Sequence, residues 1–394
     1  MPRRITGFFH LSGPTHVQGG KTMSKPIELM GISLKNPVIA AAGPWARDGR
    51  SIQRCIDAGA GAVITETITL EARQRVSPRL FVDGFRMFNT MLYSDLHLEQ
   101  WEDELEKIKK DDCKLICSIW GSSPSEIAYL ASKAERMGAD AIEISISAPI
   151  GSRNQSVCNH SSDINAFVRS AVDAVAIPVM VKLSYEAAVS PAFLRAIEQA
   201  GAKAVSAIDA LKGLRGVDIE ARRAEMSTYG GYTGRNIRPI SLATTAQLRQ
   251  YTQMQICSTG GIKTAEHALE FIMLGATAVQ MASAIQQEGY GVITKTIRDL
   301  NDWLERHGYG DVAQVRGAAL PSLMPFEDIK PQRLRAAITE CCDIATTNCS
   351  VCINGCLYDA IKREDGMIQI DQNACTGCGL CSSGCPRGII RLDW

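Results

Sequence analysis

The chain has 394 residues, of which 45% are hydrophobic and 21% are charged, a composition ordinary for a globular protein. Its formal net charge is zero, so nothing favours binding to nucleic acid or to a charged membrane surface. No apolar run approaches the roughly 18–20 residues that span a bilayer, which argues against a membrane protein.

Residues 1–25 carry two arginines and a short apolar patch that His10 and Gly13 interrupt. The patch is too brief for a secretory signal, so this segment is expected to be a disordered lead. Met23 is then a candidate natural start, and the protein is expected to be cytoplasmic.

From residue 37 to about residue 290, short apolar runs alternate with stretches of helical character. Runs that are apolar on both faces are typical of buried parallel strands. The expected strands are Pro37–Ala42, Ala62–Thr67, Lys114–Trp120, Ala141–Ser147, Val179–Leu183, Ala204–Asp209, Gln255–Thr259 and Ala278–Ala282. The clearest helices between them are Pro124–Met137, Pro191–Ala200 and Thr264–Leu274.

Eight such units predict an α/β fold, a TIM (β/α)8 barrel over residues 26–310. An open doubly wound sheet is the alternative, but no G-x-G-x-x-G motif follows the first strand. A long connection from Leu70 to Asp112 is expected to line the active-site face. Residues 311–340 read as a helical linker, and residues 341–394 as a C-terminal α+β ferredoxin-like iron–sulfur module.

The iron–sulfur prediction rests on cysteine spacing, since nine of the fourteen cysteines fall after residue 340. Cys375, Cys378, Cys381 and Cys385, followed by Pro386, have the C-x2-C-x2-C-x3-C-P spacing of bacterial ferredoxins. The first three thiolates bind three irons of one 4Fe–4S cubane, and the fourth cysteine binds a neighbouring cluster. Structural zinc is the less favoured reading.

An earlier run matches only part of this pattern, because Thr346 occupies the position of its first cysteine. By crossed ligation, Cys356 completes the cluster of Cys375, Cys378 and Cys381. Cys349, Cys352 and Cys385 begin a second cluster, whose fourth ligand is Cys341 or Cys342. Two 4Fe–4S clusters are expected, with a missing or three-iron second cluster as the alternative.

Phosphate binding is indicated near the last two strands, where TIM barrels often hold a phosphate. The seventh strand ends in Ser258-Thr259-Gly260-Gly261-Ile262, and the eighth runs into Ala282 and Ser283. Glycines allow backbone N–H groups to approach a phosphate, and a helix N-terminus adds its dipole.

The chain resembles the dihydroorotate dehydrogenase family, and most closely its dihydropyrimidine dehydrogenase branch. The segments that carry the resemblance are Asn36–Val38, Val76–Arg79, Gly138–Ala141, Val181–Ser184, Thr228–Gly234, Ile237–Pro239 and Ser258–Ile262. The resemblance implies a flavoprotein that binds FMN across the mouth of the barrel. The cofactor residues that it implies are Ala42, Gly43, Lys182, Gly231, Thr233, Gly260, Gly261, Ala282 and Ser283.

The resemblance also implies two catalytic residues, Lys182 and Cys158. Lys182 would place a positive charge beside the pyrimidine side of the flavin; a solvated lysine at a strand end is the alternative. The family supplies a proton from the loop after the fourth strand, where Cys158 stands at the cysteine position of the dihydropyrimidine branch. A thiol with the usual pKa of about 8.5 is protonated at neutral pH and can donate. An inert loop cysteine is the alternative.

The substrate positions depart from the family pattern. Asn89 is retained, but Ser145, Asp209 and Ala210 replace amide or hydroxyl groups that read a pyrimidine edge, and Glu66 replaces a lysine. Loss of these partners should reject pyrimidines. The two carboxylates favour a substrate with N–H donors or positive charge, unless they face solvent or pair with bases such as Lys212 or Arg235.

These features predict an oxidoreductase that reduces, or in reverse oxidises, a C=C or C=N bond of a small polar, non-pyrimidine substrate. The clusters would exchange electrons with an NAD(P)H-dependent flavoprotein subunit or a ferredoxin, in a homodimer or hetero-oligomer. A true dihydropyrimidine dehydrogenase subunit and a non-catalytic electron-transfer or scaffold subunit remain the alternatives.

Overall fold

The computed structural model describes residues 25–72, 78–83, 86–91, 93–146, 161–332, 334–340, 342 and 349–392. By internal contacts the chain divides into two compact units, Met1–Ser322 and Leu323–Trp394. The expected disordered lead falls almost wholly outside the described residues. None of the described helices is long and apolar enough to cross a membrane.

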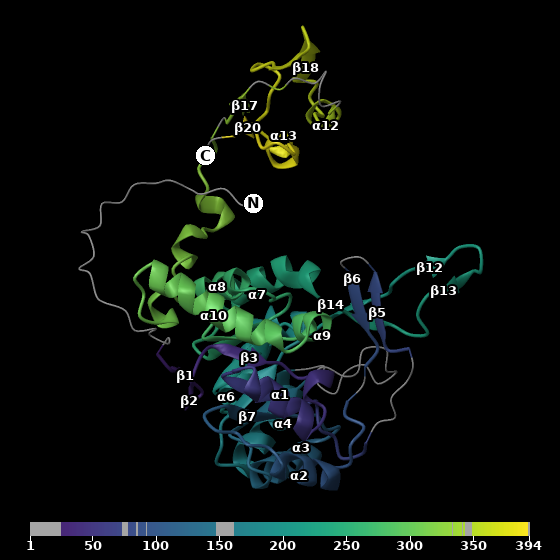
Figure 1. Ribbon diagram of the computed structural model, residues 1–394, viewed down its shortest axis with the longest axis vertical. Helices are drawn as coiled ribbons and strands as arrows, with labels where there is room; N and C mark the ends of the chain where they lie inside the picture. The colour runs from purple at the N-terminus through teal and green to yellow at the C-terminus, as the bar shows by residue number, and fades with distance from the viewer. Residues whose placement is uncertain are drawn as a thin grey trace. The chain divides into compact units, whose positions relative to one another are not determined.

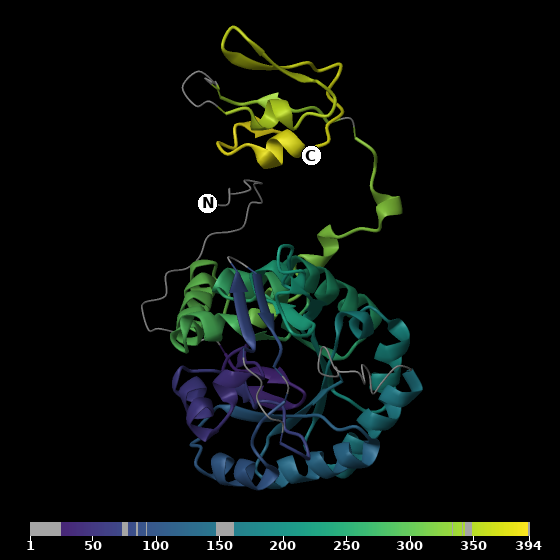
Figure 2. The same ribbon diagram turned by 90° about the vertical axis from the view of Figure 1, so that its right-hand side faces the viewer.

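The first unit is a closed parallel barrel of eight strands surrounded by helices (Figures 1 and 2). In chain order its strands are β3 Val38–Ala40, β4 Ala62–Ile64, β7 Lys114–Ile119, β8 Ala141–Ser145, β9 Val179–Lys182, β10 Ala204–Ala207, β15 Gln255–Thr259 and β16 Ala278–Met281. Pairing of β16 with β3 closes the ring. Each strand lies inside a range expected from the sequence, so the barrel prediction is confirmed.

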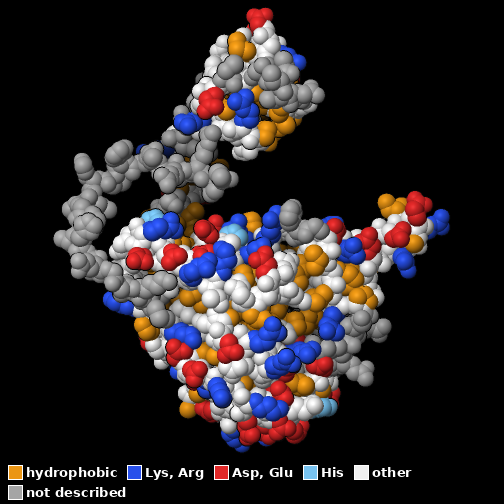
Figure 3. Space-filling model, in the orientation of Figure 1, with side chains coloured by type: hydrophobic (Ala, Val, Ile, Leu, Met, Phe, Trp, Pro, Cys, Tyr) orange, Lys and Arg blue, Asp and Glu red, His pale blue; other side chains and the backbone are white. Residues whose placement is uncertain are grey.

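The helices that cover the barrel are mostly the crossovers between successive strands. They are α1 Gly49–Asp57, α2 Leu98–Glu106, α3 Pro124–Arg136, α4 Ser161–Ala174, α5 Tyr185–Ala188, α6 Pro191–Gln199, α7 Arg238–Tyr251, α8 Ala265–Met273, α9 Ser283–Glu288 and α10 Gly291–Arg306. Gly138 and Gly275, which follow α3 and α8, have φ of 88° and 101°, the left-handed conformation that ends a helix. On the face shown in Figure 3, Lys and Arg side chains are interspersed with Asp and Glu.

Insertions build a second, four-stranded sheet in the order β11-β14-β6-β5. Its strands are β5 Leu80–Asp83, β6 Arg86–Asn89, β11 Leu211–Gly213 and β14 Gly230–Thr233. Phe88 of β6 stacks on Tyr232 of β14 with ring centroids 5.0 Å apart. Two small hairpins, β1 Ile27–Leu29 with β2 Ile32–Leu34 and β12 Val217–Asp218 with β13 Arg223–Ala224, complete the unit.

The segment after α10 contains three short 3-10 turns, Val312–Gln314, Leu320–Ser322 and Phe326–Asp328, rather than a long helix. Backbone hydrogen bonds from Gly317 to Ile272 and from Ala319 to Met273 attach its first part to α8. Residues up to Ser322 therefore belong with the barrel, although the sequence assigned them to a linker.

The second unit has two small antiparallel pairs, β17 Ala337–Ile338 with β20 Ile390–Arg391 and β18 Ile361–Glu364 with β19 Met367–Ile370. Two short helices, α12 Val351–Asn354 and α13 Leu380–Gly384, lie within the two cysteine runs. Its buried core includes Cys352 and Cys375 among a few apolar side chains. This α+β arrangement confirms the predicted ferredoxin-like module.

Candidate active site

A cavity of about 190 Å³ opens at the carboxyl ends of the barrel strands. Most of the residues proposed from the sequence line it: Ala42, Gly43, Glu66, Asn89, Ser145, Lys182, Asp209, Ala210, Thr233, Gly260, Gly261, Ala282 and Ser283. The position is the one where TIM barrels carry their active sites.

One end of the cavity is formed by backbone. Gly260 and Gly261 follow β15 with φ of 111° and 79°, which favours glycine. A Cβ on Gly260 would lie 2.1 Å from Ser241 Oγ, and one on Gly261 would lie 2.7 Å from Arg238 Cβ. Ala282 and Ser283 lie at the end of the neighbouring strand β16, where it leads into α9. These small residues leave space for an anionic group against main-chain N–H donors, as a flavin phosphate requires.

Lys182 ends β9 and is the cation within the cavity wall, with only 8% of its surface exposed. Its Nζ lies 3.8 Å from Oε1 of Glu143, a fully buried residue on the neighbouring strand β8. Burial by itself would lower the pKa of Lys182, but the Glu143 and Asp209 carboxylates outweigh burial and raise that pKa above its ordinary value. Lys182 therefore stays charged, and the alternative of a solvated lysine is wrong.

The inserted sheet contributes one wall. Asn89 ends β6 and lines the cavity, and its Nδ2 donates to the carbonyl of Gly231 at 3.5 Å. Gly231 lies beside Asn89 in the β6–β14 pairing and is the one described cofactor residue of the prediction that does not line the cavity. Thr233, two residues further along β14, does line it.

The positions that depart from the family pattern all face the same space. Ser145 is 8% exposed and Glu66 only 3% exposed, so Glu66 does not lie in solvent. Asp209 and Ala210 follow β10, and Asp209 Oδ1 accepts a hydrogen bond from the Ala210 backbone at 2.8 Å. The cavity therefore combines a buried cation with two carboxylates at its wall.

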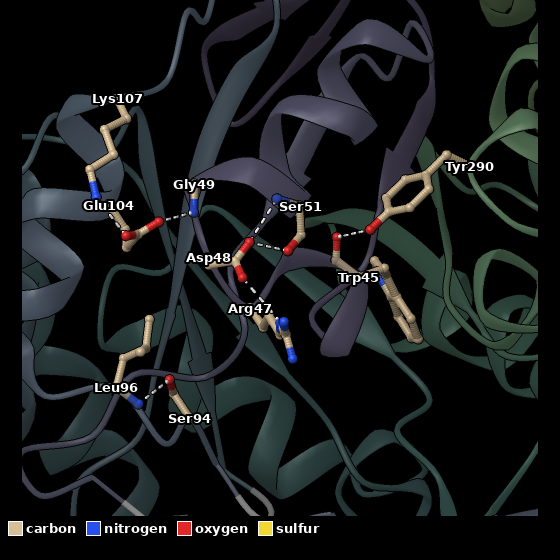
Figure 4. A network of polar contacts seen from close by, with 10 residues as sticks. All are labelled: Trp45, Arg47, Asp48, Gly49, Ser51, Ser94, Leu96, Glu104, Lys107 and Tyr290. Carbon is tan, nitrogen blue, oxygen red and sulfur yellow. Dashed lines mark hydrogen bonds and ion pairs between the residues drawn. The ribbon is translucent and has the colours of Figure 1, made fainter.

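The loop after β3 carries Trp45, a cavity residue that the sequence did not indicate. The indole ring leaves no room for a side chain on Gly43, where a Cβ would lie 2.4 Å from the ring. Figure 4 shows how the loop is fixed: Tyr290 donates to the Trp45 carbonyl at 3.3 Å, and Asp48 accepts from the Ser51 backbone at 2.8 Å. Glu104 accepts from the Gly49 backbone at 2.9 Å.

In the second unit, the described cysteines line two separate cavities. Cys356, Cys375, Cys378 and Cys381 line one cavity. Cys342, Cys349, Cys352 and Cys385 line the other, with apolar neighbours such as Ile338 and Ile389. This division follows the crossed pattern expected from the spacing. Cys341, the alternative fourth ligand, lies outside the described residues.

The described residues contain no group of three His, Cys, Asp or Glu side chains close enough to share one metal ion. A cubane does not need such a group, because each thiolate binds a different iron. Burial would raise the pKa of Cys385, but backbone N–H groups of residues 387 to 390 outweigh it and hold that pKa below its ordinary value. The thiolate that a cluster needs is therefore favoured at this position.

The sequence reasoning missed two buried polar residues inside the barrel, Glu143 and Gln280, of which Gln280 lines the cavity. Each interrupts an apolar run within its strand, Ile142-Glu143-Ile144 in β8 and Val279-Gln280-Met281 in β16. That isolation was the available signal, since a buried polar group needs partners. Cys158 falls outside the described residues, so its role remains a prediction.

A closed (β/α)8 barrel with a glycine-lined cavity and a buried lysine, followed by a cysteine-rich module, defines a cofactor-dependent redox enzyme. Comparison with known proteins agrees. A family model described as dihydroorotate dehydrogenase matches residues 26–304, and one described as 4Fe-4S binding domain matches residues 368–391. The chain therefore belongs to the dihydroorotate dehydrogenase family of oxidoreductases and carries an iron–sulfur domain.

Several curated relatives share the name dihydroorotate dehydrogenase B (NAD(+)), catalytic subunit. The Pyrococcus furiosus protein is 33% identical over 302 residues, which cover 75% of this chain and 99% of that protein. The Thermococcus kodakarensis protein is 32% identical over 303 residues, covering 75% and 97%. The Methanocaldococcus jannaschii protein is 30% identical over 293 residues, covering 73% and 95%. The similarity thus covers the barrel rather than the whole chain.

Proposed function

We propose that this chain is a flavin- and iron–sulfur-dependent enzyme that reduces, or in reverse oxidises, a C=C or C=N bond of a small polar substrate. The observation that carries the proposal is the shared cavity: the buried Lys182 and the Gly260–Gly261 turn open onto one space. In it Gly260, Gly261, Ala282 and Ser283 would hold the phosphate of FMN, and Lys182 would lie beside the ring. Bound FMN supplies hydride transfer and exchanges single electrons with iron–sulfur clusters.

The protein groups have separate tasks. Lys182 stays protonated and favours negative charge on the neighbouring ring system. The Trp45 loop and the β6–β14 pair form part of the cavity wall. Cys158 would donate a proton to the substrate.

We further propose that the substrate is not a pyrimidine carboxylate. The buried Glu66 lines the cavity and would repel the carboxylate of dihydroorotate. Ser145, Asp209 and Ala210 also lack the amide groups that pair with a pyrimidine edge. A neutral or cationic substrate with N–H donors suits this wall better, because the carboxylates accept hydrogen bonds.

Oxidation of dihydroorotate is the second candidate, and the names of the relatives favour it. The two candidates separate in one experiment on anaerobically purified protein. Flavin bleaching is followed after addition of dihydroorotate, dihydrouracil or a panel of cyclic imines and amines. Rapid bleaching by dihydroorotate would refute the non-pyrimidine proposal. A protein without a flavin absorbance shoulder would refute the flavoenzyme and favour a scaffold role.

The electron partner is part of the proposal. Two 4Fe–4S clusters, one per group of four cysteines, pass single electrons to or from a second protein, an NAD(P)H-dependent flavoprotein subunit or a ferredoxin. The relatives are named as catalytic subunits, which supports a separate partner subunit. Affinity purification from native extract tests this: a flavoprotein recovered in a fixed ratio supports the first partner, and electron transfer only with added ferredoxin supports the second.

A further inference from the structure

A polar layer lies inside the barrel next to the cavity, and one of its members, Gln280, lines the cavity wall. Glu143 of β8, Ser206 of β10 and Gln280 of β16 belong to strands that alternate around the ring. Side chains from alternate strands form one layer of a TIM barrel, and such layers are dominated by bulky branched apolar residues. Here Ser206 Oγ and Gln280 Nε2 each donate to Glu143 Oε2 at 2.8 Å.

The chemistry of these groups fixes their orientation. An ionised carboxylate only accepts hydrogen bonds, so Gln280 has to present its NH2 group and not its carbonyl oxygen to Glu143. Both donors converge on Oε2. Within the described part of the chain, Glu143 Oε1 has no hydrogen-bond donor, and it is the oxygen that lies 3.8 Å from Lys182 Nζ.

The charges of Glu143 and Lys182 depend on each other. Glu143 is fully buried and Lys182 is 8% exposed, so neither charge is solvated by bulk water. Removing one partner of such a buried pair leaves an uncompensated charge, which destabilises a fold strongly, whereas removing both is often tolerated. The hydrogen bonds from Ser206 and Gln280 keep the Glu143 carboxylate in place under Lys182.

We propose that Glu143 is a positioning residue that acts through Lys182: it holds the ammonium at the base of the cavity and offsets its positive charge. The expected effect of Glu143 on the flavin potential rests on the proposed flavin site. The expected effect of the Glu143–Lys182 pair on protein stability does not. Ser206 and Gln280 hold the Glu143 carboxylate by hydrogen bonds, and Glu143 in turn holds the Lys182 ammonium. The positive electrostatic potential at the flavin therefore depends on the Glu143–Lys182 pair and not on Lys182 alone.

The effect on stability is tested by a double-mutant cycle, measured by thermal unfolding of the full chain with its clusters. Glu143→Gln and Lys182→Met each leave one buried charge, so each should lower the melting temperature. The double variant removes both charges and should melt above either single variant. Ser206→Ala removes one hydrogen bond but retains both charges, so it serves as the matched control and should show the smallest loss. Additive losses in the double variant, or a double variant that fails to fold, would overturn the proposal.

The redox consequence is tested by the midpoint potential of bound FMN between pH 6 and pH 10. Without Glu143, Asp209 is the remaining carboxylate that offsets the charge of Lys182, with the Cys257 thiol also nearby. More of the Lys182 charge is then uncompensated, so the potential of Glu143→Gln should shift to more positive values. Because one carboxylate fewer opposes burial, the pKa of Lys182 should fall, and this shift should disappear as pH rises through that pKa. Ser206→Ala should keep the potential of the unmodified protein. A Glu143→Gln protein that binds FMN with an unchanged potential at every pH would refute the inference.

If the flavin proposal itself is wrong, the experiments give a different result from the failure of the Glu143 proposal. Unmodified protein without bound FMN would remove the redox measurement, while the unfolding cycle would still decide whether Glu143 acts through Lys182.

Discussion

Substitution of Gly260 by alanine should weaken FMN binding, because the proposed phosphate site needs backbone N–H groups that no side chain covers. The new Cβ would lie 2.1 Å from Ser241 Oγ, where an ordinary contact is 3.4–4 Å. Ser241 is buried, with its hydroxyl bonded to the Ile237 carbonyl, so the turn itself has to move by about 1 Å to reach a contact of at least 3 Å. A movement of this size breaks one or two hydrogen bonds to a charged phosphate, worth roughly 1.5–3 kcal/mol each.

The expected weakening of FMN binding is therefore about 10- to 10⁴-fold, at 1.4 kcal/mol per factor of ten. Gly138→Ala is the matched control: its φ of 88° imposes a similar backbone penalty, about 1–2 kcal/mol, but nothing lies within 4 Å of its Cβ position. Fluorescence titration of FMN into deflavinated protein measures both variants. Equal FMN affinity for Gly260→Ala and unmodified protein, or an equal loss in Gly138→Ala, would refute the phosphate assignment.

Further predictions concern the clusters, the proton donor, the substrate and the pH range. Anaerobic protein should contain about eight irons per chain, and Cys342→Ser should reduce this toward four; an unchanged iron content in Cys342→Ser would exclude it as a ligand. Cys158→Ser should retain FMN but slow steady-state turnover by about 10²–10⁴-fold, and unchanged turnover would remove Cys158 from the mechanism. Uracil and dihydroorotate should be poor substrates, and Asp209→Asn combined with Ser145→Asn should recover measurable uracil binding by calorimetry. Burial, together with the Arg238 and Lys263 cations, lowers the pKa of His267 to about 4 from 6.5. Stability should therefore fall as pH drops from 6.5 toward 4, where the unfolded chain binds the extra proton, and this component should be absent in His267→Gln by thermal unfolding.

The repeating part of the fold could be predicted from the sequence because its signals are local. Barrel strands are apolar on both faces. Glycines such as Gly138 and Gly275 end the helix that precedes the next strand. The cysteine spacing likewise fixed which side chains can reach a common cluster. Both signals lie within a few residues, so one sequence is enough to read them.

The remaining features depend on contacts between distant residues. Strands β11 and β14 have only three and four residues, too few for a periodic pattern, and β14 pairs with β6 far away in the chain. Glu143 and Gln280 are separated by 137 positions, so their hydrogen bond has no sequence signature. The assignment of Cys342 to the second group likewise depends on how the chain folds back onto Cys385.

The crossed grouping of the cysteines has a consequence for the lifetime of the protein in a cell. The second unit buries few apolar side chains, and metal binding supplies folding free energy directly in units of this kind. Each group takes three cysteines from one run and one from the other, so a cluster bound by either group, as proposed, would hold both halves of the unit together. Loss of either cluster would loosen both halves together and expose the unit to proteases. Iron starvation would then lower the amount of folded protein, and not only its activity, and so couple the abundance of the enzyme to the iron supply.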